Sequence, residues 1–470
     1  MIKQGGAKNI SVKKNLIYQM GYQFFMMITP FILSPYLARI FGPENIGRTS
    51  FISNINNYFL LFASLGISVY GNREIAFVRN DRNKLSQIFM DIFFVHFIVG
   101  SIIFVIYLFF CFYTKNDQIL YLISSLNILA TIVDISWFYA GIEKFKITIF
   151  RNVLMKVCCI ILIFLFVHSH LDIGLYLFIN ASTLLIGQLL TWIALTKYIT
   201  FVKPDYRKIL YHLKQMIILF VPIVAMNIYH QMDKTLLGIM STNAELGFYV
   251  YAERIIAIPV ALFSVVSTVM MPRISHVTHQ KQYEQQNQYI NIMFKLNTFL
   301  SIGSFFGLLA ISHIFVELFF GIDFYKVSDI VKCLSLTLPI IGFSNVIGNG
   351  YLLPNKKDNI WILSLVVGGI VNLVADMFLI RYWYALGAAW GTVLAELSVL
   401  IVQFILCKNN FEWKVVFKYV FRNIISGIVM FLIVYQILFY GENWQFLILS
   451  VSIGFVIYTF LSFFNFKNIK

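Results

Sequence analysis

The sequence predicts an all-α membrane protein of about fourteen transmembrane helices, and three observations lead to this fold class. Hydrophobic residues make up 59% of the 470 positions and charged residues only 12%, whereas about 25% of a soluble domain is charged. The hydrophobic residues form blocks of roughly 20, the length with which a helix crosses about 30 Å of hydrocarbon. Alternating apolar segments of about ten residues, which are typical of an outer-membrane barrel, are not seen.

The apolar blocks predict the helices in order along the chain. The basic N-terminus precedes an apolar run that is too long for a signal peptide and lacks a small-residue cleavage site, so we expect this run to remain as the first helix. The predicted spans are 16–38, 47–69, 87–113, 119–140, 150–168, 174–196, 215–240, 247–271, 290–319, 328–353, 360–380, 387–407, 420–440 and 443–464.

The basic residues predict the orientation, because Lys and Arg are retained in the cytoplasm. With the N-terminus inside, 26 of the 36 Lys and Arg residues fall in cytoplasmic segments and 5 in outer segments. An even number of spans then places both termini in the cytoplasm. The net charge of +15 is explained by this topology and by attraction to anionic membrane lipids, so we expect no nucleic-acid partner.

A weak internal repeat divides the chain into halves. Residues 41–47 follow the first predicted span, and the similar turn 241–247 follows the seventh. The repeat predicts two six-helix lobes, 1–214 and 215–407, related by a pseudo-two-fold axis along the membrane normal. The last two spans, in 408–470, lie outside this repeat.

The short loops favour a transporter over an enzyme. The predicted outer loops have roughly 4 to 10 residues, which leaves no large outer loop or cytoplasmic domain for a soluble active site. The sequence has no cluster of metal ligands, no phosphate-binding Gly-rich loop and no pairing of a nucleophile with a base. We therefore expect no catalytic residues, no metal and no resident cofactor.

Polar residues at helical spacing mark the first, second, seventh and eighth spans. Inside a bilayer such side chains are costly, and they either face a water-filled cavity or bond to a neighbouring helix. Because they gather in the first two spans of each half, they indicate a central cavity. The expected cavity residues are Gln23, Asn54, Asn57, Asn227, His230 and Gln231.

Charged residues within or beside these spans predict two further functions. Lys234 and Arg254 lie about 10 Å below the outer surface, and with Arg39 and Arg48 they can form a cationic lining, although Arg48 can also be a loop residue without a role. Asp233 and Glu253 can simply pair with neighbouring cations. The acidic candidates for coupling to H⁺ or Na⁺ are Asp134, Asp233, Glu253, Asp376 and Glu396.

Several of these stretches resemble one family. Residues 134–145, followed by Arg151 and Asn152, are similar to the end of helix 4 and the next loop of bacterial polysaccharide repeat-unit flippases, the Wzx-like members of the MOP exporter superfamily. Residues 70–76 resemble their loop between helices 2 and 3. Residues 38–42 and 233–254 resemble turns that these proteins share with lipid II flippases. The resemblance covers nearly the whole chain.

The resemblance implies a substrate and a mechanism. The substrate would be an oligosaccharide repeat unit on undecaprenyl diphosphate, moved by alternating access from the inner to the outer leaflet of the bacterial cytoplasmic membrane. Capsule, O-antigen or exopolysaccharide would be the product, with a polymerase and a chain-length regulator as partners. The diphosphate would contact Arg39, Arg48, Lys234 and Arg254, and the sugars would contact the polar cavity residues.

Two alternatives remain from the sequence. A MATE-like ion-coupled exporter of small molecules would need an acidic cavity for cationic substrates, whereas the predicted cavity is basic. A membrane polysaccharide polymerase or ligase would need a long outer loop with Arg or His pairs.

Overall fold

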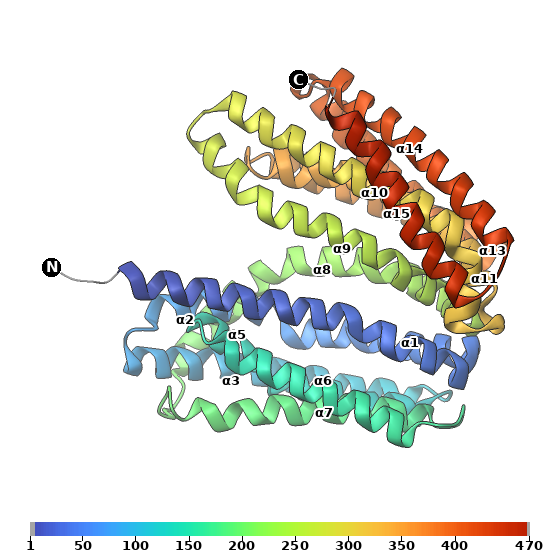
Figure 1. Cartoon of the computed structure of the whole chain (residues 1–470). Coiled ribbons are helices and arrows are strands. Elements are labelled where there is room, and N and C mark those ends of the chain that lie inside the picture. Colours follow the sequence, from blue (N-terminus) through green and yellow to red (C-terminus); the bar gives the residue numbers. More distant parts are fainter. Residues whose placement is uncertain (1–4, 468–470) are drawn as a thin grey trace. The chain divides into compact units, whose positions relative to one another are not determined.

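The computed structural model describes the backbone of residues 5–467 and the side chains within 21–462, except those of residues 24, 225, 226 and 228–230. The described chain is helical throughout, without strands (Figure 1). It divides into two compact units. The first unit comprises Met1–Phe41 and Arg48–Gln231, and the second comprises Gly42–Gly47 and Met232–Lys470. The divisions between them therefore fall inside two helices, α1 and α8.

The first unit contains seven helices and the first part of an eighth. Their bounds are α1 (Gly5–Ser64), α2 (Ile67–Val78), α3 (Arg82–Tyr113), α4 (Gln118–Ile132), α5 (Ser136–Gly141), α6 (Phe145–Phe166), α7 (Ile173–Leu195), the 3₁₀ turn η1 (Tyr206–Lys208) and α8 (Ile209–Met240). An aromatic core around Phe89 holds α2, α3 and α5 together, with Trp137 and Phe138 as buried partners.

The second unit contains the end of α8 and the remaining helices. These are α9 (Asn243–His279), α10 (Tyr283–Phe320), η2 (Ile322–Phe324), α11 (Lys326–Ser335), α12 (Thr337–Asn345), the π-helical η3 (Val346–Leu352), α13 (Asp358–Cys407), η4 (Lys408–Asn410), α14 (Trp413–Phe439) and α15 (Trp444–Lys467). Small residues let α14 and α15 pack closely on α10: a Cβ at Gly427 or Gly303 would lie 2.3 or 2.6 Å from a neighbouring ring.

The structure confirms the predicted all-α membrane fold. Eleven helical stretches of the described residues are long and apolar enough to cross a membrane. Two of these stretches are interrupted by non-helical residues, Gly42 within α1 and Tyr384 within α13. Each of these two breaks divides one stretch into two spans. With α8 added, the described helices correspond to the fourteen predicted spans.

Two local predictions were wrong. Residues 70–78, expected in a loop, belong to the short helix α2, which leaves α1 through Leu65 and Gly66 in left-handed backbone conformation. The span predicted at 119–140 is interrupted at 133–135, between α4 and α5. Asp134 lies in this interruption, where its Oδ1 accepts a hydrogen bond from the backbone N–H of Ser136 at 2.8 Å.

The two repeated turns contact each other within the second unit. A Cβ added at Gly47 would lie 1.6 Å from the carbonyl oxygen of Asn243, and one at Gly247 would lie 2.1 Å from that of Pro43. Glu44 accepts hydrogen bonds at 3.1 Å from the backbone N–H of Ala244 and from the side chain of Asn243, at the start of α9. The repeat therefore corresponds to a close backbone crossing that only glycine permits.

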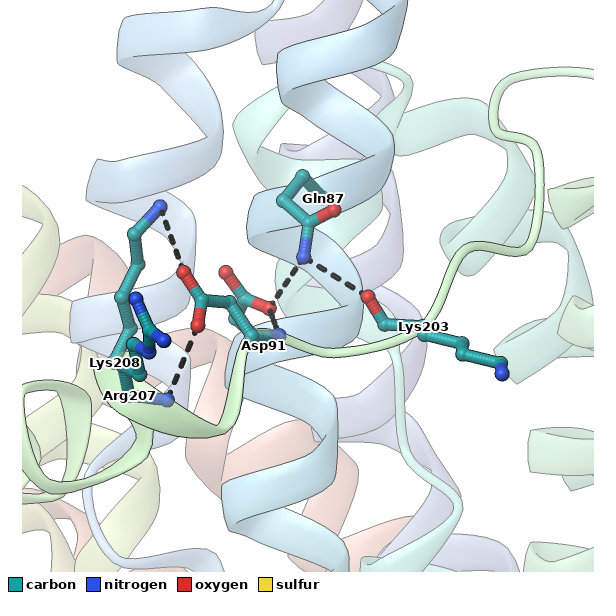
Figure 2. A network of polar contacts seen from close by, with 6 residues as sticks. Gln87, Asp91, Lys203, Arg207 and Lys208 are labelled. Carbon is teal, nitrogen blue, oxygen red and sulfur yellow. Dashed lines mark hydrogen bonds and ion pairs between the residues drawn. The ribbon is translucent and has the colours of Figure 1, made fainter.

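A polar network joins α3 to the segment before α8 (Figure 2). Asp91 is fully buried, and its Oδ1 accepts hydrogen bonds from Gln87 Nε2 at 2.8 Å and from the backbone N–H of Asp205 at 2.7 Å. Gln87 also donates to the carbonyl oxygen of Lys203 at 3.1 Å. These bonds hold the connecting segment against α3.

Candidate functional site

A group of oxygen ligands surrounds Asp233, which lies on α8 and is 9% exposed. Tyr249 of α9 donates from Oη to Asp233 Oδ2 at 2.6 Å. Thr392 of α13 donates from Oγ1 to the same oxygen at 2.9 Å, and Tyr249 Oη and Thr392 Oγ1 are 3.0 Å apart. Three helices of the second unit thus meet at one carboxylate.

A second carboxylate completes this site. Asp376 of α13 is fully buried and interacts electrostatically with Asp233. Neither oxygen of Asp376 has a hydrogen-bond partner among the described residues, and Asp233 Oδ1 lacks one too. Gly391 makes room for this carboxylate, because a Cβ there would lie 1.9 Å from Asp376 Oδ1. We call Asp233, Asp376, Tyr249 and Thr392 the carboxylate pair site.

The break in α13 explains how one helix supplies both Asp376 and Thr392 to the carboxylate pair site. Tyr384 has φ 49° and ψ −125°, so the segments before and after it fold back on each other. Gly387 follows this break, and a Cβ there would lie 2.2 Å from the carbonyl oxygen of Leu379. This reversal brings Thr392 and Gly391 beside Asp376. In one straight helix these residues would lie more than 20 Å from Asp376.

The carboxylate pair site suits a small monovalent cation. Two charged carboxylates close together inside a membrane protein repel each other, and a shared proton or a bound cation would relieve this repulsion. The surrounding groups are oxygens, which hard cations prefer. Within the described residues there is no group of three or more His, Cys, Asp or Glu side chains placed to hold a metal ion.

The five acidic candidates lie in different surroundings. Asp233 and Asp376 come together in the carboxylate pair site. Glu253 forms an ion pair with Lys234 at 2.9 Å, so local pairing accounts for it. Asp134 lines a polar cavity of the first unit, and Glu396 is half-buried on α13.

Sequence reasoning assigned no coupling role to Tyr249 and Thr392. Their side chains complete the site from α9 and α13, and nothing local in the sequence relates Thr392 to Asp233, which is 159 positions earlier.

The four basic candidates occur in pairs on separate units. In the first unit, Arg39 is exposed on α1, and Arg48 forms an ion pair with Asp117. In the second unit, Lys234 pairs with Glu253, and the Arg254 guanidinium lies 4.9 Å from the ring centre of Tyr251. Their convergence on one substrate stays a prediction.

The polar cavity candidates differ in exposure. Gln23 and Asn57 are exposed. Asn54 is 2% exposed and donates to the backbone oxygen of Gln231 at 3.5 Å, which brings α1 and α8 together. Asn227 donates to the carbonyl oxygen of Ile223 in its own helix at 2.9 Å. The side chain of His230 lies outside the described residues.

An apolar cavity of about 260 Å³ lies in the second unit between α10, α14 and α15, with Leu262 of α9 at its edge. Glycine and serine residues of α10 and α15 line it together with Tyr458 and Phe455.

Comparison with known proteins identifies relatives over most of the chain. The model of the family described as "Polysaccharide biosynthesis protein" matches residues 12–278. A protein of Escherichia coli strain K12 named "Putative O-antigen transporter" is 23% identical over 409 residues, covering 85% of this chain and 98% of the relative.

Two solved structures share the fold. The lipid II flippase MurJ in an inward closed conformation has a TM-score of 0.72 and 20% identity, covering 97% of this chain and 99% of that one. A MATE family multidrug resistance transporter of the MOP superfamily, in an inward-facing conformation, has a TM-score of 0.62 and 12% identity, covering 83% and 94%. These two structures support the same helical architecture.

Proposed function

Because the chain belongs to the polysaccharide biosynthesis protein family, we propose that it moves undecaprenyl-diphosphate-linked oligosaccharide repeat units from the cytoplasmic to the outer leaflet. Its relatives include a protein named "Putative O-antigen transporter" and a lipid II flippase of Bacillus subtilis strain 168, and the many membrane-spanning helices support transport. The observation that carries the proposal is the match of the family over more than half of the chain.

The proposed orientation has both termini in the cytoplasm of a bacterial cell membrane. The distribution of Lys and Arg supports it, with 26 residues in the segments assigned to the inside and 5 outside. In this orientation the diphosphate would contact the four basic candidates, Arg39, Arg48, Lys234 and Arg254. Arg48 and Lys234 are held by Asp117 and Glu253, so they would have to exchange these carboxylates for a phosphate.

We further propose that the carboxylate pair site binds the coupling ion, H⁺ or Na⁺. The support is the unpartnered oxygen atoms of Asp376 and Asp233 in the described structure. Binding a cation would stabilise the arrangement in which α8, α9 and α13 meet, and its release would destabilise that arrangement. Transport would then be driven by an ion gradient, through the difference in affinity between two states.

The function is tested by deleting the gene in its host. The proposal predicts that lipid-linked repeat units accumulate on the cytoplasmic face and that surface polysaccharide is lost. Accumulation on the outer face would point to a later step such as polymerisation. Unchanged polysaccharide together with increased sensitivity to cationic drugs would support a MATE-like exporter.

A further inference from the structure

A polar cavity of about 500 Å³ lies inside the first unit, apart from the carboxylate pair site. It is bounded by α1 and α4 to α7, and its lining consists largely of amide, hydroxyl and charged side chains. Asn127, Asn152 and Asn180 supply amides, and Tyr22 and Ser136 supply hydroxyls. Such a composition is unusual within membrane-spanning helices, where polar groups mark pathways or binding sites.

The cavity holds two cations and one carboxylate. Arg151 and Lys156, both on α6, line it together with Asp134. At 1.5 Å per residue, Arg151 lies about 9 Å and Lys156 about 16 Å along α6 from its start at Phe145. The formal charge of the lining is therefore +1.

Arg151 is buried without an anionic partner in contact. It is 8% exposed and donates to Ser136 Oγ at 3.1 Å, to Gly187 O at 3.4 Å and to the amide oxygen of Gln188. All three acceptors are neutral, and its Nε has no acceptor. Asp134 interacts with it only electrostatically.

Lys156 is half-buried in the same cavity. None of the ion pairs formed by the described residues includes Lys156 or Arg151. A buried cation without a counter-ion costs free energy, which an anionic ligand would recover on binding.

We propose that this cavity binds the glycan of the transported substrate and that Arg151 and Lys156 hold an acidic substituent, a carboxylate or a phosphate group. The inference rests on the proposed function and specifies its substrate class. The amides and hydroxyls match the hydroxyl groups of sugars. The net charge of +1 matches a single acidic substituent better than the carrier diphosphate, which has about two negative charges.

The first test is chemical analysis of the polysaccharide that disappears when the gene is deleted. The inference predicts an acidic substituent in each repeat unit, and assays for uronic acid and for organic phosphate distinguish the two sources. A wholly neutral polysaccharide would overturn the inference and leave the flippase function intact. If no polysaccharide disappears, the proposed function itself fails, and the inference fails with it.

The second test replaces Lys156, which makes no hydrogen bond to the described protein and can be changed without removing a link between helices. In the deletion strain, Lys156→Gln is expected to lower surface polysaccharide about tenfold, the effect of losing one charged contact. Lys156→Arg is expected to restore it. Equal membrane levels of both variants are verified by immunoblotting. Wild-type polysaccharide from Lys156→Gln would overturn the inference.

Discussion

Gly47 and Gly247 each leave room for a backbone carbonyl oxygen of the other repeated turn. A methyl group at Gly247 would lie 2.1 Å from Pro43 O, and backbone atoms cannot withdraw as the end of a flexible side chain can. We expect Gly247→Ala to destabilise the protein by at least the roughly 1–3 kcal/mol of an overpacked core. Thermal unfolding of the purified protein in detergent measures this loss.

Gly21→Ala is the matched control, since a Cβ at Gly21 meets nothing within 4 Å. It should unfold at the wild-type temperature or slightly above, because alanine favours a helix. Wild-type stability of Gly247→Ala would show that the two turns do not cross as closely as described.

Asp376 allows a direct test of ion coupling. Asp376→Asn keeps the size of the side chain and removes its charge, so the pair no longer requires a cation. We expect this variant to lose transport driven by an ion gradient while its level in the membrane stays at that of the wild type. Ion-dependent transport in proteoliposomes is the measurement, performed separately with Na⁺ and pH gradients.

Asp358→Asn is the control for this prediction, because Asp358 lies on the same helix but is exposed at its first turn. It should transport as the wild type does. Full gradient dependence in Asp376→Asn would remove the carboxylate pair site from the coupling mechanism.

At the scale of the helical elements, the network around Asp91 tests how the connecting segment is held. Asp91→Ala leaves the backbone N–H of Asp205 and the amide of Gln87 without their acceptor. Because Asp91 is fully buried, we expect a loss of about 2–3 kcal/mol in the free energy of unfolding. Asn83→Ala, at an exposed position of α3, should cause a much smaller loss, and equal losses would contradict the role of the network.

Asp81 allows a pH-dependent test at the start of α3. Hydrogen bonds from the backbone N–H groups of Lys84 and Asn83 lower the pKa of its carboxyl below the ordinary 3.8. The charged form therefore stabilises the folded state fully above about pH 3.8, and this contribution is lost as the pH falls through the lower folded pKa. Asp81→Asn should unfold at a lower temperature than the wild type at pH 7. The difference should disappear in acid, and a pH-independent difference would contradict the assignment.

The helices were predictable from the sequence to different extents. Long apolar blocks showed where the spans lie, because length and hydropathy are local properties. The sequence predicts a loop where helix α2 lies, because α2 is short and carries Arg73 and Glu74 among its residues. The interruption at 133–135 was missed because no glycine or proline marks it.

The candidate site was predicted only in part. Asp233 and Asp376 each stood out as acids within apolar spans, but 143 positions separate them and no local pattern pairs them. The return of Gly391 and Thr392 to the site depends on the reversal of α13 at Tyr384, a tyrosine with positive φ, which a hydropathy pattern cannot reveal. The ion pairs of Arg48 and Lys234 likewise depend on tertiary packing.

At the scale of the whole molecule, the proposed flippase function requires that the two compact units together move a large amphiphile across the membrane. Alternating access needs at least two arrangements of these units, each stabilised by different contacts. The proposed contributions are separate: a cation at the carboxylate pair site, and a glycan in the cavity around Arg151.

The most direct measurement is flipping by the purified chain in liposomes. Undecaprenyl diphosphate carrying a labelled saccharide of the host repeat unit is placed in both leaflets, and an impermeant enzyme or quencher reports how much reaches the outer leaflet. The account predicts that all of the label becomes accessible in vesicles with the wild-type protein, and only about half in vesicles without protein. Accessibility that stays at about half with folded wild-type protein, under both Na⁺ and pH gradients, would contradict the proposed flippase function.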